Sequence, residues 1–140
     1  MMSRTVLLLV LLLGTLASLG AEIAPEEYQK MQLSSEEHLE ILVRSVSKKS
    51  WLFSRETNVT VNAEVMVVHR SRTGLREGDQ ITIAYTHSKL RKGWAGPRPI
   101  PILKRKSETS AFLSFDERKK VYVPSARGYS FESLIIPPLF

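Results

Sequence analysis

The chain has 140 residues, no cysteine and a formal net charge of +6 at pH 7. The lack of cysteine excludes disulfide bonds, zinc–thiolate sites and thiol nucleophiles, so stability must come from packing. The charge is uneven: Glu22 to Glu40 holds six glutamates and one lysine, whereas Lys89 to Lys106 holds seven basic residues and no acidic one. We therefore expect an electrically polarised domain whose basic side favours anionic partners, with the alternative that these side chains only solvate a surface around a proline-rich loop.

The N-terminus has the layout of a signal peptide. Arg4 precedes an apolar run from Val6 to Leu13, which is shorter than the roughly 18 to 20 residues that cross a bilayer. Small residues at Ser18 and Gly20 favour cleavage after Gly20, with an uncleaved anchor as the alternative. The expected organisation is a signal peptide (1–20), an N-terminal segment (21–36), a β domain (37–132) and an apolar C-terminal tail (133–140). The protein is thus expected to be exported, periplasmic or extracellular.

The expected elements begin with a short helix near Pro25 to Met31 and a first strand around 39–43. The capping-box spacing of Ser34 and Glu37 also permits a helix there. The clearest strand is Asn58 to Arg70, where apolar and polar residues alternate.

A strand around Ile81 to Tyr85 follows a connector that contains Gly74, Gly78 and Asp79, so the two should pair in antiparallel fashion. Matching their apolar faces gives three predicted pairs: Val67 with Ile81, Val65 with Ile83 and Ala63 with Tyr85.

Prolines between His87 and Ser107 exclude a central strand, so this segment is a loop or an extended edge. Alternation resumes at 111–115, and Val121 to Val123 forms a short last strand before Pro124. The expected fold is mainly all-β, a small five-stranded barrel with a short N-terminal helix.

Five strands with a long connection between the third and fourth resemble an OB-fold, and their order is similar to that of netrin-type domains, which include tissue inhibitors of metalloproteinases (TIMPs). The run Gly93 to Pro97, the strand at 111–113 and the closing run Gly128 to Glu132 look like signatures of uncharacterised bacterial exported proteins. Such inhibitors chelate the target's zinc through an N-terminal cysteine. This chain has no cysteine, so that residue cannot be carried over.

The histidines His38, His69 and His87 give little support for catalysis or metal binding. In the register above Val61 lies opposite His87, which places His69 and His87 eight residues apart, about 27 Å, too far to share a metal. His38 has no firm placement. The aspartates at positions 79 and 116 lie in expected turns. We therefore expect no catalytic residue, no metal and no cofactor, and predict that the protein is not an enzyme.

The candidate ligand surface consists of cations around one tryptophan. It comprises Lys89, Arg91, Lys92, Trp94, Arg98, Lys104, Arg105 and Lys106. An aromatic ring among cations suits stacking on a sugar, although Trp94 could instead cap the barrel end. We predict an exported binding module that binds acidic polymers, such as an acidic polysaccharide, through this basic loop. The alternative is an inhibitor-like protein that docks on another extracytoplasmic protein. Export argues against nucleic acid, and a membrane is expected only if the signal segment is uncleaved.

Overall fold

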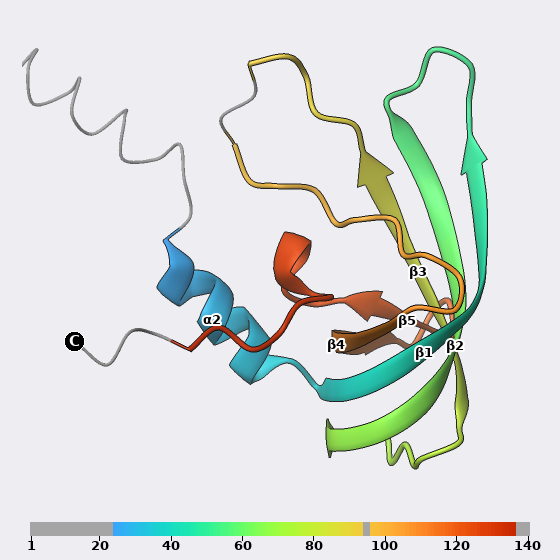
Figure 1. The fold of residues 1–140 in the computed structure, drawn as a ribbon, viewed down its shortest axis with the longest axis vertical. Helices are drawn as coiled ribbons and strands as arrows, with labels where there is room; N and C mark the ends of the chain where they lie inside the picture. Colours follow the sequence, from blue (N-terminus) through green and yellow to red (C-terminus); the bar gives the residue numbers. More distant parts are fainter. Residues whose placement is uncertain (1–23, 94–95, 137–140) are drawn as a thin grey trace, which may run out of the picture.

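The computed structural model describes residues 24–93 and 96–136, so the expected signal peptide and Trp94 lie outside the described residues. The elements are helix α2 (Pro25–Ser34), strands β1 (Glu37–Ser50), β2 (Glu56–Ser71), β3 (Gln80–Ser88), β4 (Glu108–Asp116) and β5 (Val121–Pro124), and the 3-10 turn η1 (Arg127–Tyr129) (Figure 1). The strands close a barrel in the order β1-β2-β3-β5-β4. The predicted mainly β class, with a five-stranded barrel and a short N-terminal helix, is confirmed.

Helix α2 joins the C-terminal segment to the barrel. Pro25 occupies its first turn, where a missing N–H costs nothing. Gln32 is fully buried, and its Nε2 donates to the carbonyls of Tyr129 (3.0 Å) and Ser133 (3.2 Å). The backbone N–H of Ile135 donates to Gln32 Oε1 at 2.8 Å. The described part of the tail therefore runs along α2.

The core is formed by alternate residues of the strands, as period-two patterning predicts. Its fully buried aliphatic side chains include Leu39, Ile41, Val43, Val61, Val65, Ile83 and Leu113. Strand β4 departs from alternation, because Phe112, between two core residues, is also fully buried. Its backbone bonds to Ser130, and the ring of His38 stacks on it at 4.2 Å. Phe112 thus packs on the outside of the barrel under the C-terminal segment.

The predicted register of β2 and β3 was wrong by four residues. The observed pairs are Ala63 with Ile81, Val61 with Ile83, Val59 with Tyr85 and Thr57 with His87. A slip of four residues leaves every side chain on the same face, so matching apolar faces cannot detect it. The connector decides the register instead. It folds back along β2, where Gly78 N–H donates to the carbonyl of Val65 and Val65 N–H to that of Asp79, both at 2.8 Å.

Strands β1 and β2 are long and bent, and bulges make this possible. Their ladder shifts register between His38 and Leu39, between Glu40 and Ile41, and again after Val43. Each bulge adds local twist and re-aims the next side chain. The distal halves of the two strands project away from α2 and end in a tip at residues 51–54 (Figure 1).

Candidate functional site

The described residues of the segment between β3 and β4, 89–93 and 96–107, are held against the barrel by two side chains of β3. The hydroxyl of Tyr85 donates to the carbonyl of Pro101 at 2.8 Å and accepts from the N–H of Leu103 at 3.3 Å. His87 Nδ1 lies 2.7 Å from the carbonyl oxygen of Ile100. Because a carbonyl only accepts, His87 carries a proton on Nδ1. We call the segment 89–107 the arm.

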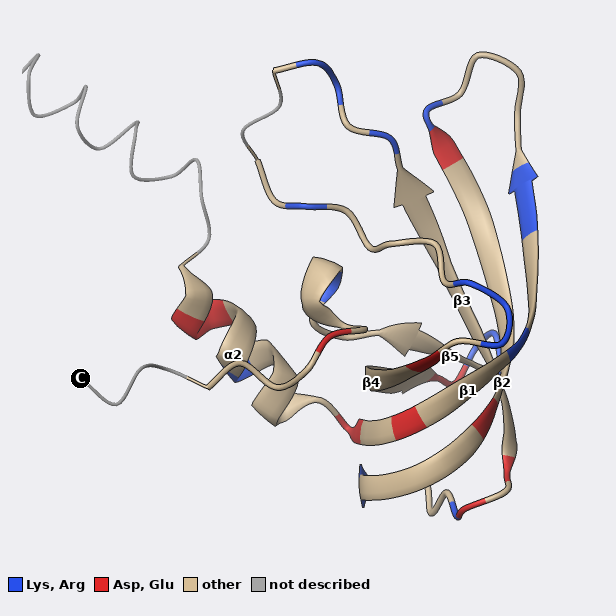
Figure 2. Ribbon diagram, in the orientation of Figure 1, with Lys and Arg blue, Asp and Glu red and all other residues tan. Residues whose placement is uncertain are grey.

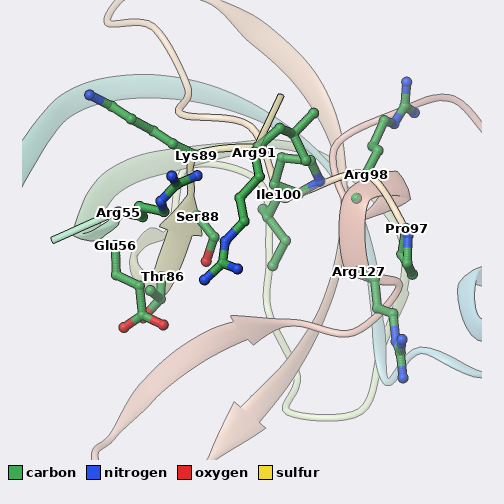
Figure 3. Close-up of a pocket in the computed structure, with 13 residues that line it drawn as sticks. Arg55, Glu56, Thr86, Ser88, Lys89, Arg91, Pro97, Arg98, Ile100 and Arg127 are labelled. Atoms are coloured by element: carbon green, nitrogen blue, oxygen red, sulfur yellow. The ribbon is translucent and has the colours of Figure 1, made fainter. Parts of the chain in front are cut away.

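A cavity of about 650 Å³ lies between the arm, the start of β2, the end of β3 and η1 (Figure 3). Five of its thirteen lining residues are cations, namely Arg55, Lys89, Arg91, Arg98 and Arg127. Glu56 is the single carboxylate among the described lining residues, and Thr86 and Ser88 add hydroxyl groups. Cations and hydroxyl donors around a hollow suit the binding of carboxylate, sulfate or phosphate groups.

The cavity cations lie on two sides. Figure 3 shows Arg55 and Arg91 beside the strand ends, and Arg98 and Arg127 beside η1. Arg98 lies 4.2 Å over the ring of Tyr129 and pairs with Glu132. Within residues 24–93 and 96–136, no ion pair of the structure involves the other four lining cations. These four cations therefore have no carboxylate partner among the described residues. Figure 2 places several basic segments on the arm and near the tip, and acidic ones on α2 and early β1.

A close backbone approach between η1 and the arm shapes this cavity. A Cβ at Gly128 would lie 2.5 Å from the carbonyl oxygen of Arg98, closer than any side chain permits. Arg127, the preceding residue, has a φ of +48°, which L-residues rarely adopt. Glycine is therefore required at 128 for the arm to reach its position, and a strained backbone presents Arg127 at the cavity wall.

The structure divides the predicted basic surface in two. Lys89, Arg91 and Arg98 come together in the cavity. Lys92 is exposed on the same arm but is not among the lining residues, and Trp94 lies outside the described residues. The cluster at 104–106 sits at the other end of the arm.

That second cluster is bound to the edge of β1. Lys106 N–H donates to the carbonyl of Val43, and Val43 N–H donates to Ser107. Arg105 and Lys106 line a separate hollow of about 290 Å³ with Arg44. The predicted ligand residues are therefore two groups of cations on different parts of the surface.

Two cavity residues, Arg55 and Arg127, were missed by the sequence analysis. Both are isolated cations in the sequence, far from the basic run, and the topology brings them to it. Of the two, only Arg127 could have been singled out from the sequence, because it directly precedes the closing run Gly128 to Glu132. Charge runs detect neighbours along the chain and not neighbours across a barrel.

An exposed apolar tip adjoins the cavity through Arg55. Trp51, Leu52 and Phe53 are 69%, 85% and 99% exposed. The ammonium group of Lys49 lies 5.4 Å from the centre of the Trp51 ring. Contiguous exposed apolar side chains of this kind often mark surfaces that contact a protein or a membrane.

The structure brings together His38 and His69, which the sequence analysis had not placed near each other. Their ring centroids are 4.4 Å apart, beside Glu40. Burial lowers the pKa of His38, with a further lowering from His69 and Arg70 and an opposing effect of Glu40. His87 pairs with Thr57 at the far end of β2, twelve residues from His69, about 40 Å along the strand.

No family model matches this chain, and neither curated proteins nor solved structures gave a match. Across residues 24–93 and 96–136, none of the helices has the length and apolar character needed to span a bilayer.

Proposed function

We propose that this domain is an exported, non-catalytic binding module whose cavity holds the anionic groups of an acidic polymer. The carrying observation is that four lining cations have no carboxylate partner among residues 24–93 and 96–136, around a hollow of about 650 Å³ that has one lining carboxylate. Unbalanced cations in a recess raise the local concentration of anions. The strand order supports the proposed likeness to OB-type and netrin-type domains, and OB-type barrels bind ligands at the barrel face and flanking loops.

A polymer fits this arrangement better than a single small anion. Figure 3 shows Ile100 between the two groups of cations, and prolines 97 and 99 also line the cavity. An extended chain with charges at intervals would meet both cationic sides, while its sugar rings would cover the apolar residues between. The volume lies within the roughly 300 to 1,000 Å³ typical of ligand sites.

The test uses polygalacturonate and dextran sulfate as probes. The double variant Arg91→Gln, Arg127→Gln removes one cation from each side, and we expect at least about a 10-fold loss of affinity, since each charge-assisted contact contributes roughly 1.5 to 3 kcal/mol. The control Arg118→Gln, Lys119→Gln removes two exposed cations of the β4–β5 turn. Equal binding by parent and double variant, or an equal loss in the control, would count against the cavity. Parent binding should also weaken with added salt.

Docking on another extracytoplasmic protein is the second candidate, and the apolar tip favours it. Cations at Lys48, Lys49 and Arg55 flank three exposed apolar side chains, which matches an acidic protein surface with an apolar centre. Replacing Trp51, Leu52 and Phe53 with serine separates the candidates. If the domain docks on a protein through the tip, this variant should lose salt-insensitive capture of that protein and keep polymer binding. If the domain binds polymers only, the variant should bind polymer as the parent does.

A further inference from the structure

A bulge brings two histidines and a glutamate onto one outer face of the barrel. Leu39 pairs with Val68 and His38 with Arg70, which leaves His69 as the extra residue of β2. The bulge turns His69 toward β1. His38 and Glu40, two positions apart on β1, share the face that meets it.

These three side chains converge closely. One possible ligand atom from each lies within 4.8 Å of the other two. His69 Nε2 is 3.2 Å from Glu40 Oε1. Tetrahedral zinc, with bonds of about 2.0 to 2.2 Å, would set ligand atoms about 3.4 Å apart. The ligand atoms, all within 4.8 Å of one another, therefore lie within about 1.4 Å of this separation.

Neighbouring residues already orient the cluster. The hydroxyl of Ser110 donates to Glu40 Oε1 at 2.7 Å, and the His38 ring stacks on fully buried Phe112. The guanidinium of Arg70 donates to the carbonyls of Ser35 (2.9 Å) and Gln32 (3.0 Å), which ties that cation to the end of α2. A hydrogen bond to a ligand carboxylate, such as that from Ser110, fixes the direction of a metal ligand and raises affinity.

We propose that His38, Glu40 and His69 form a surface site for a divalent transition-metal ion, with Zn²⁺ the best match. Two imidazoles and one carboxylate suit zinc, whereas calcium and magnesium prefer oxygen ligands throughout. His69 and Glu40 are 44% and 37% exposed, so a fourth position faces solvent and is free for water or for a ligand group from a partner. This site is independent of the anion cavity.

The experiment is zinc titration of the full chain by calorimetry, with Co²⁺ absorption to report tetrahedral coordination. We expect about one equivalent of bound Zn²⁺, a loss of affinity of at least about 10-fold in His69→Gln and in His38→Asn, and a smaller loss in Ser110→Ala. The matched control is His87→Gln, which removes a histidine far from the cluster and should leave zinc binding unchanged.

Folding is checked by circular dichroism, and His69→Gln is the decisive variant because His69 is exposed and lies outside the core. The proposal is overturned if the parent shows no saturable zinc binding. It is equally overturned if His69→Gln keeps the parent affinity, or if His87→Gln loses as much as His69→Gln.

Discussion

The two ends of the β1–β2 ladder differ in whether their side chains find hydrogen-bond, ion-pair or packing partners within the domain. At the end near α2, buried Gln32 bonds three backbone groups, and Arg70 bonds two carbonyls at the helix end. At the distal end, three apolar side chains of the tip are exposed, and four of the five cations that line the adjoining cavity have no carboxylate partner among the described residues. At the helix end, the polar groups of Gln32 and Arg70 are therefore hydrogen-bonded within the fold. The distal end keeps contact groups that a partner would satisfy.

The largest effect is expected from Phe112→Ala at the helix end. Phe112 is fully buried, and removing a buried phenylalanine costs about 3 to 5 kcal/mol of unfolding free energy. Denaturant unfolding measures this cost, and polymer binding by the folded fraction should persist. If Phe112→Ala keeps the parent's unfolding free energy but loses polymer binding, the division between the two ends is wrong.

Gly128→Ala should affect both properties, because Gly128 joins η1 to the arm. The new Cβ would meet the Arg98 carbonyl, so the arm must shift, at a cost of about 1 to 3 kcal/mol and with loss of the cavity shape. The matched control is Gly74→Ala. Gly74 has a φ of +80° and open space around its Cβ, so the control should lose about 1 kcal/mol through backbone strain alone. Unchanged polymer binding in Gly128→Ala would show that the cavity does not need this contact.

Tyr85 links the arm to β3 and gives a prediction at high pH. Burial raises the pKa of Tyr85, with an opposing effect of the hydrogen bond from Leu103. Since the folded-state pKa lies above the unfolded value near 10, this stabilisation is complete below about pH 10 and is lost as pH rises through the folded-state pKa. We expect Tyr85→Phe to lose about 1 kcal/mol at neutral pH and to decline less steeply above pH 10. Parallel pH curves for parent and variant would contradict this.

Local patterns predicted much of the fold, and contacts across the barrel account for the rest. Alternation in 58–70 and prolines after His87 correctly predicted strands and arm. The β2–β3 register depended on backbone bonds from the connector to Val65, which no side-chain pattern encodes. The position of His69 depended on a bulge, which exists only relative to a partner strand.

The candidate site could likewise be predicted from the sequence only in part, because some of its cations are neighbours along the chain and others meet across the barrel. A run of cations along the chain marks the arm, but the arm crosses the barrel between Arg98 and the cluster at 104–106. Arg55 and Arg127 come from opposite ends of the domain sequence. A contiguous charge count therefore includes cations that lie elsewhere and omits cations that complete the cavity.

The smallest effect is expected from replacing Lys104, Arg105 and Lys106 with glutamine. The sequence analysis placed these residues in the ligand surface, whereas the structure separates them from the cavity. All three are exposed, and among the described residues they form no ion pair. Solvated cations add little to folding, so the unfolding free energy should change by less than about 0.5 kcal/mol.

Polymer affinity should also fall less in this triple variant than in Arg91→Gln, Arg127→Gln, although the triple variant removes more charge. The comparison is made at one salt concentration, because general attraction between the basic domain and an acidic chain is screened over about 8 Å at physiological salt. Binding that depends on cavity geometry predicts the larger loss in the double variant. Binding that depends on total charge predicts the larger loss in the triple variant, and that result would move the ligand surface from the cavity to the whole basic face.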